Sequence, residues 1–152
     1  MRGLGRMIPA AFLWLAACTA DDPAAALEGL VRDAAAAAEA RQTAFFRDLL
    51  AESYVDAHGN DRERMIDFIR GYFLANPSID VFSRVESIEL AGADAAEVVV
   101  LAGWLARRPG EGVLAGFDGR LYRLELELIQ TGGGWRVIGA RWERALDALT
   151  GD

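Results

Sequence analysis

Leu121–Trp142 reads LYRLELELIQTGGGWRVIGARW and predicts two strands joined by a tight turn. From 122 to 128, tyrosine and leucine alternate with arginine and glutamate, which is the period of a strand with one buried and one solvated face. The glycines within 131–134 predict a hairpin turn. Residues 135–142 then predict the returning strand.

Two further strands are predicted upstream of this hairpin. Residues 79–90 alternate imperfectly, and a change of register near 82–85 indicates a bulge. Residues 95–106 contain the apolar run VVVL, followed by Trp104. The intervening Gly-Ala-Asp at 92–94 predicts the turn that connects them.

Two helices are predicted before the strands. The Ala-rich residues 24–53 carry apolar side chains at three-to-four spacing, and Asp22 with the proline after it supplies an N-cap and a first turn. A second helix is predicted over 61–75, where Asn60 and Glu63 have the spacing of a capping box.

These elements make one α+β domain. A long helix, a short strand at 54–56, a second helix and four antiparallel strands fit a chain of 152 residues. We expect two N-terminal helices packed on one face of a strongly bent antiparallel sheet. A bent sheet of this kind tends to leave a cavity between sheet and helices.

Composition excludes several classes of function. The net charge is −7, whereas nucleic-acid binding needs an excess of basic residues, so no nucleic-acid partner is expected. All 16 basic residues are arginine, which excludes Schiff-base lysine chemistry and a phosphate-loop lysine. With one His and one Cys, a His/Cys zinc site and an internal disulfide are also excluded, and we expect no metal or cofactor.

The N-terminus has the pattern of an export signal. Two arginines precede an apolar run of 11 residues, 7–17, which is too short for a spanning helix of about 20 residues. Leu15-Ala16-Ala17-Cys18 resembles the bacterial lipobox. That resemblance implies cleavage before Cys18 and lipidation of its sulfur. Thr19, rather than an Asp, follows the cysteine, and under the sorting rule of enteric bacteria this implies anchoring on the periplasmic face of the outer membrane. The alternative is a secreted protein with a free thiol.

These features divide the chain into a lipoprotein signal peptide (1–17), a lipidated Cys18 with a short tether (18–23), and a single domain (24–152). In the mature chain 14 arginines remain against 23 acidic residues, a net charge of −9. Anionic lipid repels such a body, so we expect the lipid on Cys18, rather than a basic patch, to hold it at the membrane.

Nearly all of residues 24–145 resemble the nuclear transport factor 2-like superfamily. The resemblance rests on Tyr54-x-Asp56-x-x-Gly59-Asn60-Asp61, on the helix after it, and on the closing pattern from Tyr122 to Trp142. It implies a cystatin-like cone, as in SnoaL-like polyketide cyclases and ketosteroid isomerases. The superfamily holds enzymes, binding proteins and dimerisation modules, so the fold alone does not define the role.

Asp56 and His58 are the candidate catalytic pair. The resemblance places Asp56 where ketosteroid isomerases carry the general base, and His58, two residues on, would share its face and assist. The family's donor tyrosine on the first helix has no counterpart here, because no tyrosine occurs between 24 and 53. The alternative is that Asp56 braces the turn and His58 is a solvated loop residue.

Aromatic residues are the candidate ligand-binding set, with core packing as the alternative for most of them. The candidates are Tyr54, Tyr72, Trp104, Tyr122 and Trp142. Asp56, Asn60 and Asp61 could offer oxygen ligands to calcium, but their spacing does not match a calcium loop, and we expect no metal there.

Charged residues on alternate positions of the 122–128 strand predict a solvated outer face of the sheet. Arg84, Arg123 and Arg141 could meet an acidic ligand, but surface salt bridges are the simpler expectation. A large apolar interface on that face is therefore not expected, and we predict a monomer or a weak homodimer.

Two functions remain open at the level of the sequence. The first is a lipid-anchored, non-catalytic protein that binds a small apolar ligand or a partner protein through the cone. The alternative is an isomerase- or cyclase-like enzyme with Asp56 as base and His58 assisting, which requires the Asp56 carboxylate to point into an enclosed pocket.

Overall fold

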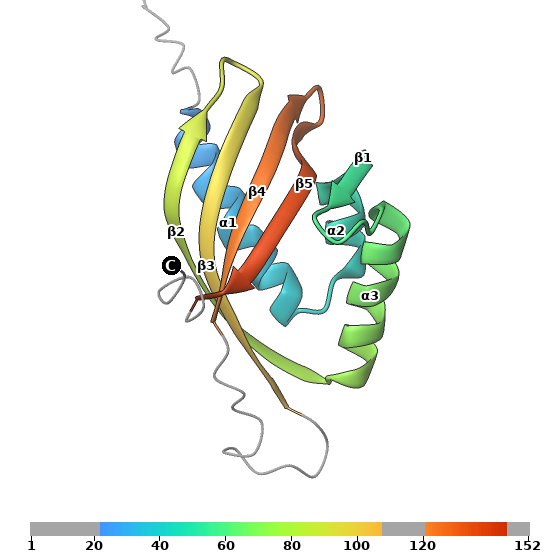
Figure 1. Ribbon diagram of the computed structural model, residues 1–152. Helices are drawn as coiled ribbons and strands as arrows, with labels where there is room; N and C mark the ends of the chain where they lie inside the picture. The colour runs from blue at the N-terminus through green and yellow to red at the C-terminus, as the bar shows by residue number, and fades with distance from the viewer. Residues whose placement is uncertain (1–21, 108–120, 146–152) are drawn as a thin grey trace, which may run out of the picture.

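The computed structural model describes residues 22–107 and 121–145 (Figure 1). The predicted signal peptide and Cys18 lie outside these residues. No helix within the described ranges is long and apolar enough to cross a bilayer.

The first helix, α1 (Pro23–Glu39), begins as predicted: the side chain of Asp22 accepts a hydrogen bond from the backbone N–H of Ala24 at 3.0 Å. The single helix expected over 24–53 is wrong. After α1 the chain turns at Arg41, which adopts the left-handed conformation (φ 54°), and the Gln42 N–H closes the helix end by donating to the Ala37 carbonyl at 2.8 Å. The rest of that segment forms α2 (Thr43–Leu49) and β1 (Leu50–Asp56).

The third helix, α3 (Arg62–Ala75), occupies the predicted range, but the predicted capping residue is wrong. Asp61, not Asn60, is the N-cap, and its carboxylate accepts the N–H of Arg64 at 3.0 Å. The Asn60 side chain is unavailable for capping because it is bonded to Asp56. At the other end, Asn76 donates its side-chain amide to the Tyr72 carbonyl at 2.8 Å.

Five strands form one sheet in the order β1-β5-β4-β3-β2. The remaining four strands are β2 (Ser78–Leu90), β3 (Ala95–Arg107), β4 (Leu121–Thr131) and β5 (Gly134–Arg144). These four pair antiparallel, as expected, with a bulge between Val85 and Ser87. β1, however, pairs parallel with β5, so the sheet is mixed rather than antiparallel.

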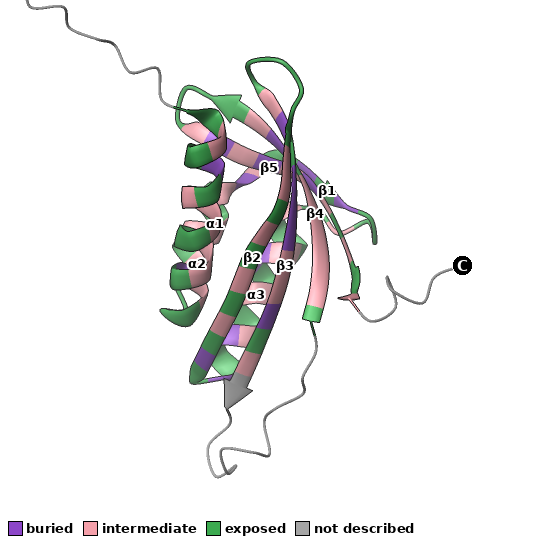
Figure 2. Ribbon diagram, turned by 90° about the vertical axis from the view of Figure 1, so that its left-hand side faces the viewer, coloured by how far each residue is buried: buried purple, intermediate pink, exposed green. Residues whose placement is uncertain are grey.

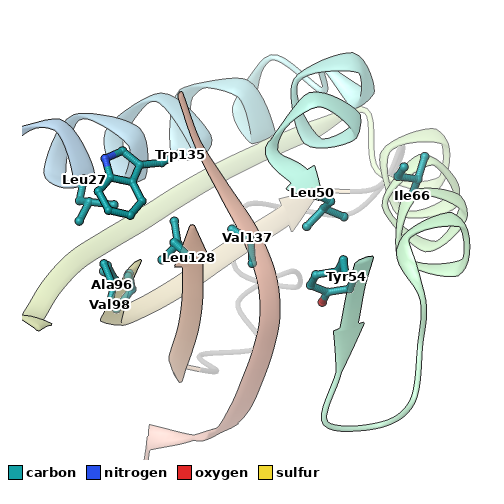
Figure 3. Packing of buried hydrophobic residues seen from close by; sticks show 10 residues of the cluster. Leu27, Leu50, Tyr54, Ile66, Ala96, Val98, Leu128, Trp135 and Val137 are labelled. Atoms are coloured by element: carbon teal, nitrogen blue, oxygen red, sulfur yellow. The ribbon is translucent and has the colours of Figure 1, made fainter. Parts of the chain in front are cut away.

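Helices α1 and α2 lie behind the sheet in Figure 1, and α3 lies beyond its β1 edge. The face towards α1 is called the inner face here. Its core runs along the sheet: Figure 3 shows Leu27 beside Trp135 at one end, and Leu50, Tyr54 and Ile66 at the other. Exposed and part-buried residues alternate along much of β2, as one buried and one solvated face require (Figure 2).

Charged side chains bind backbone groups of both edge strands. On β2, the Val81 N–H donates to the Glu39 carboxylate at 2.9 Å. On β1, the Arg62 Nε donates to the Leu50 carbonyl at 3.0 Å, and the same guanidinium donates to the Arg47 carbonyl at 2.7 Å. Such contacts occupy edge groups that would otherwise be open to pairing with another strand.

Candidate functional site

Asp56 ends β1 and is buried, with 5% of its surface exposed. One carboxylate oxygen accepts the backbone N–H groups of His58 (2.8 Å) and Asn60 (2.9 Å), and the other accepts the Asn60 side-chain amide (2.9 Å). The backbone closes the same turn, because the Asp56 N–H donates to the Asn60 carbonyl at 3.0 Å. Gly59 supplies the left-handed conformation that the turn requires (φ 79°). The Asp56 carboxylate is thus bonded to its own turn.

These contacts also set the charge of Asp56. Burial raises the pKa of the Asp56 carboxyl, but the hydrogen bonds from Asn60 and His58 outweigh burial and hold the pKa below its usual value. A general base is effective when its pKa lies near the working pH and its oxygen can reach a substrate proton. Neither condition fits Asp56. The geometry favours the alternative role that the sequence left open, a brace for the turn.

His58 lies on the exposed part of the same turn. Its ring contacts Trp142 of β5, with centroids 4.9 Å apart and planes tilted by 58°. Trp142 pairs with Leu124, which packs against the core, so the contact lies at the inner face. The turn therefore brings His58 onto an aromatic side chain, while Asp56 makes its contacts within the turn.

The five candidate ligand-binding residues do not form one cluster. Tyr54 belongs to the core and is 2% exposed, and its burial, with the charge of Asp56, raises the pKa of its hydroxyl. Tyr72 lies on α3, stacked on Phe68 with centroids 6.5 Å apart. Tyr54 therefore packs in the core, which is the alternative to ligand binding that the sequence left open.

Trp104 and Tyr122 do form a pair. Their rings are parallel within 9°, with centroids 5.0 Å apart. Ala102 and Trp104 point to the same side of β3, and Tyr122 pairs with Ala102, which packs against the core. The pair therefore extends the inner face towards the end of β3. Trp104 remains 41% exposed there, so one large aromatic surface of the pair is open to contact.

The interior under α1 is nearly filled. A cavity of about 30 Å³ lies between α1 and the sheet, lined by apolar side chains of Leu27, Leu30, Val31, Ala34, Leu49, Val98, Leu126, Leu128 and Val137. Ligand pockets are typically several hundred Å³ and carry a few polar groups, so this cavity does not fit a ligand site.

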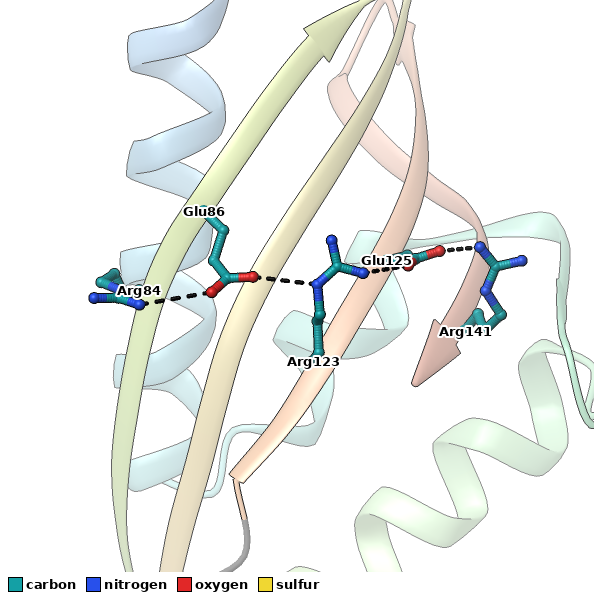
Figure 4. Close-up of polar contacts among 5 residues, drawn as sticks. All are labelled: Arg84, Glu86, Arg123, Glu125 and Arg141. Carbon is teal, nitrogen blue, oxygen red and sulfur yellow. Dashed lines mark hydrogen bonds and ion pairs between the residues drawn. The ribbon is translucent and has the colours of Figure 1, made fainter. Parts of the chain in front are cut away.

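The outer face of the sheet carries the predicted salt bridges (Figure 4). An alternating chain runs Arg84–Glu86–Arg123–Glu125–Arg141 across β2, β4 and β5. The pKa of Glu125 is lowered, first by the hydrogen bond from Arg141 and then by the charges of Arg141 and Arg123. These effects outweigh burial, which acts in the opposite direction. The part of the outer face that this chain of residues crosses is polar, as the strand pattern predicted.

Residues 22–107 and 121–145 contain no group of three or more His, Cys, Asp or Glu side chains able to hold a metal ion. Asn60 and Asp61, considered above as calcium ligands with Asp56, are used to bind Asp56 and to cap α3.

Three residues with clear roles were missed by sequence reasoning: Arg62, Glu39 and Asn60 as the partner of Asp56. For Asn60 a signal was present, because an Asp followed by Gly and Asn in one short segment is typical of a side-chain-braced turn. Arg62 and Glu39 reach backbone groups 12 and 42 residues away, and no local pattern marks such contacts.

No protein-family model and no curated protein sequence matches this chain. Solved structures do match. A domain of unknown function with a cystatin-like fold from Nostoc punctiforme aligns with a TM-score of 0.65 at 15% identity, over 84% of this chain and 82% of that one. A nuclear transport factor 2-like protein of unknown function from Silicibacter pomeroyi aligns with a TM-score of 0.60 at 17% identity, over 80% of this chain and 94% of that one.

An enzyme is similar in fold as well: a hexachlorocyclohexane dehydrochlorinase aligns with a TM-score of 0.61 at 13% identity, over 80% of this chain and 84% of that one. At such identities the likeness establishes the fold and leaves the activity open. The expected architecture is confirmed: the chain has the cystatin-like, nuclear transport factor 2-like α+β fold.

Proposed function

We propose that this protein is a lipid-anchored, non-catalytic binding domain. Its ligand is a small apolar molecule, or an apolar side chain of a partner protein, held at the end of the inner face. The observation that carries the binding role is the stacked Trp104–Tyr122 pair, which leaves Trp104 41% exposed beside a well-packed core. Aromatic rings of this kind offer a large apolar surface together with a polar atom at the rim.

The isomerase- or cyclase-like alternative receives no support from the geometry. It needs the Asp56 carboxylate directed at a substrate, whereas both oxygens accept hydrogen bonds within residues 56–60. It also needs donors for a developing oxyanion, and no tyrosine occurs between 24 and 53 to supply the family's donor.

The anchor is supported by the sequence. Leu15-Ala16-Ala17-Cys18 places the chain's single cysteine where lipidation requires it, and Asp22, the cap of α1, follows Cys18 by only four positions. We therefore place the protein on the periplasmic face of the outer membrane, as a monomer or weak dimer. Intact mass of the protein from the membrane fraction tests this: a diacylglycerol adduct on Cys18 is expected, and an unmodified thiol would contradict it.

Binding is tested by native mass spectrometry of the protein extracted gently from membranes. A reproducible bound mass is the expected result, and its identity would give the ligand class. A ligand-free protein that forms a crosslink through Trp104 or Tyr122 in cells would indicate the partner-protein form of the proposal. A ligand-free protein without any such crosslink would contradict both forms.

A further inference from the structure

Two tight turns and the start of α1 lie at one end of the domain, called the hairpin pole here. The turns are residues 91–94, between β2 and β3, and residues 131–134, which include the last residue of β4 and the first of β5. Figure 1 shows both turns and the start of α1 at the same end of the sheet, and the end of α3 at the other.

Contacts confirm this direction for α1. Its last residue, Glu39, bonds to Val81 near the start of β2, whereas Leu27, in its second turn, packs with Ala96 and Trp135 beside the hairpin pole. From Ser78 to Leu90, β2 spans about 40 Å at ~3.3 Å per residue. The two ends of the domain are therefore well separated.

We propose that the hairpin pole is the surface that rests on the lipid bilayer, and that the Trp104–Tyr122 end points away from the membrane. This inference rests on the proposed lipid anchor. Four residue steps from Cys18 to Asp22 span at most about 14 Å when fully extended. The start of α1, and with it the hairpin pole, must then stay close to the headgroups.

The residues of the hairpin pole are better suited to contact a lipid surface than the residues of the outer sheet face. Asp94 is the one ionisable residue in the eight positions 91–94 and 131–134, and four of the eight are glycine. Leu90, directly before the first turn, is 45% exposed. The start of α1 adds the exposed Asp22, and the Arg136 guanidinium lies against the second turn, so the pole carries few charges and both signs among its small residues. Such a surface with an apolar side chain can approach headgroups at modest desolvation cost.

If the domain lay with its outer sheet face on the membrane, acidic residues would meet lipid. Glu97 pairs with Glu89 on one side and Glu127 on the other, so three glutamates stand in adjacent register across β2, β3 and β4, next to the hairpin pole. With the outer face down, all three would lie flat against the lipid. Anionic lipid repels such a row. The exposed side of α1 is also charged, with Glu28, Arg32 and Asp33.

This orientation limits what the aromatic pair can meet. Trp104 pairs with Val81, which lies nine residues before Leu90 along β2, or about 30 Å at ~3.3 Å per residue. A ligand or partner would therefore reach the pair from the aqueous side, and a lipid still seated in the bilayer would not.

Site-directed labelling tests the orientation in the full, lipidated chain. Single Ala→Cys variants at Ala93 (hairpin pole), Ala36 (α1 surface) and Ala75 (end of α3) replace exposed alanines with side chains of similar size. Each variant is reconstituted in vesicles of phosphatidylethanolamine and phosphatidylglycerol and reacted with a water-soluble maleimide. The Cys18 thiol is blocked by its lipid, and the same variants carrying Cys18→Ala, mixed with the same vesicles, give the unanchored reference rates.

Anchoring is expected to slow labelling of Ala93→Cys about fivefold or more and to change Ala36→Cys and Ala75→Cys by less than about twofold, as headgroup contact at one pole requires. Equal rates at Ala93→Cys with and without the lipid, or equal slowing at Ala36→Cys or Ala75→Cys, would overturn the orientation. Hydrogen exchange of amides 91–94 and 131–134 in the unsubstituted protein gives the same comparison without a variant: protection by vesicles is expected, and its absence counts against the proposal.

Flotation separates this inference from the anchor itself. Protein that floats with vesicles yet labels equally at all three positions retains the anchor and loses the orientation. Protein that fails to float overturns the anchor, and the orientation with it.

Discussion

The Asn60 side-chain amide donates to one carboxylate oxygen of Asp56 at 2.9 Å, and the Asn60 backbone N–H donates to the other oxygen at 2.9 Å. Asp56 is thereby held from both sides by a single residue four positions along the chain. The carboxylate that the family resemblance offered as a general base joins the end of β1 to the start of α3.

Replacing Asp56 tests its structural role. Asp56→Ala leaves the His58 and Asn60 N–H groups without their acceptor, and we expect a loss of about 2–4 kcal/mol in the free energy of unfolding. Asp56→Asn sets an amide against the Asn60 amide and is expected to cost about 1–3 kcal/mol. Urea unfolding measures both. Asp67→Asn, on the exposed face of α3, is the control and should change stability by less than about 0.5 kcal/mol.

The pH dependence of stability follows from the same carboxylate. The pKa of Asp56 is lowered in the folded state, so its stabilisation is present above the unfolded-state pKa of about 3.9 and is lost as the pH falls through the folded-state pKa. The stability difference between the wild type and Asp56→Asn should thus be constant from pH 7 to about pH 5 and shrink below about pH 4. A difference that stays unchanged down to pH 3 would contradict this role for the charge.

Arg62 should contribute more to stability than neighbouring arginines. Its guanidinium donates to the carbonyls of Arg47 and Leu50 and thereby ties α3 to the end of α2 and the start of β1. We expect Arg62→Ala to cost about 1–3 kcal/mol, and Arg62→Lys to recover little because an ammonium lacks the fork that reaches both carbonyls. Arg70→Ala is the control, since it removes one exposed ion pair with Asp67 and should cost at most about 0.5 kcal/mol. Equal effects at positions 62 and 70 would contradict the account.

Arg41 offers a stabilising substitution. It holds a left-handed backbone (φ 54°) that costs an L-residue about 1 kcal/mol and costs glycine almost nothing. Allowing for the greater entropy of an unfolded glycine, Arg41→Gly should raise the free energy of unfolding by about 0.5 kcal/mol. Ala38→Gly, within α1, should instead lower it by about 1 kcal/mol. Thermal melts of the two variants measure both changes. Destabilisation by Arg41→Gly would show that the Arg41 side chain has a stabilising role of its own.

The strand pattern of the sequence predicted much of the fold, because its signals are local. Alternation at 122–128, the glycines at 131–134 and Asp22 before a proline each report on their own neighbourhood, and each corresponds to an observed strand, turn or cap. The polar outer face followed from the same alternation.

Features that depend on distant contacts were not predictable in this way. Helix propensity extends through Ala40 into the following residues, so nothing local predicted the break at Arg41 or the start of β1 at Leu50; the predicted short strand at 54–56 is the second half of β1. The parallel pairing of β1 with β5 joins Asp56 to Ala140, far along the chain. In the site, the sequence predicted a role for Asp56, but that role depends on whether its oxygens face a substrate or the turn, and this is a matter of three-dimensional geometry.

A single native mass spectrometry comparison distinguishes ligand binding at the Trp104–Tyr122 pair from a reaction at Asp56. The wild type, Asp56→Asn, Trp104→Ala and Phe82→Ala are extracted from membranes under the same conditions and compared for retained ligand. Phe82 is the matched control, since it is an aromatic residue 54% exposed on the neighbouring strand, paired with Gly103 and therefore on the opposite face from Trp104. The account predicts that the wild type, Phe82→Ala and folded Asp56→Asn carry the same bound mass, and that Trp104→Ala loses it. Loss of the ligand, or accumulation of an unconverted precursor, in folded Asp56→Asn while Trp104→Ala remains normal would contradict the account.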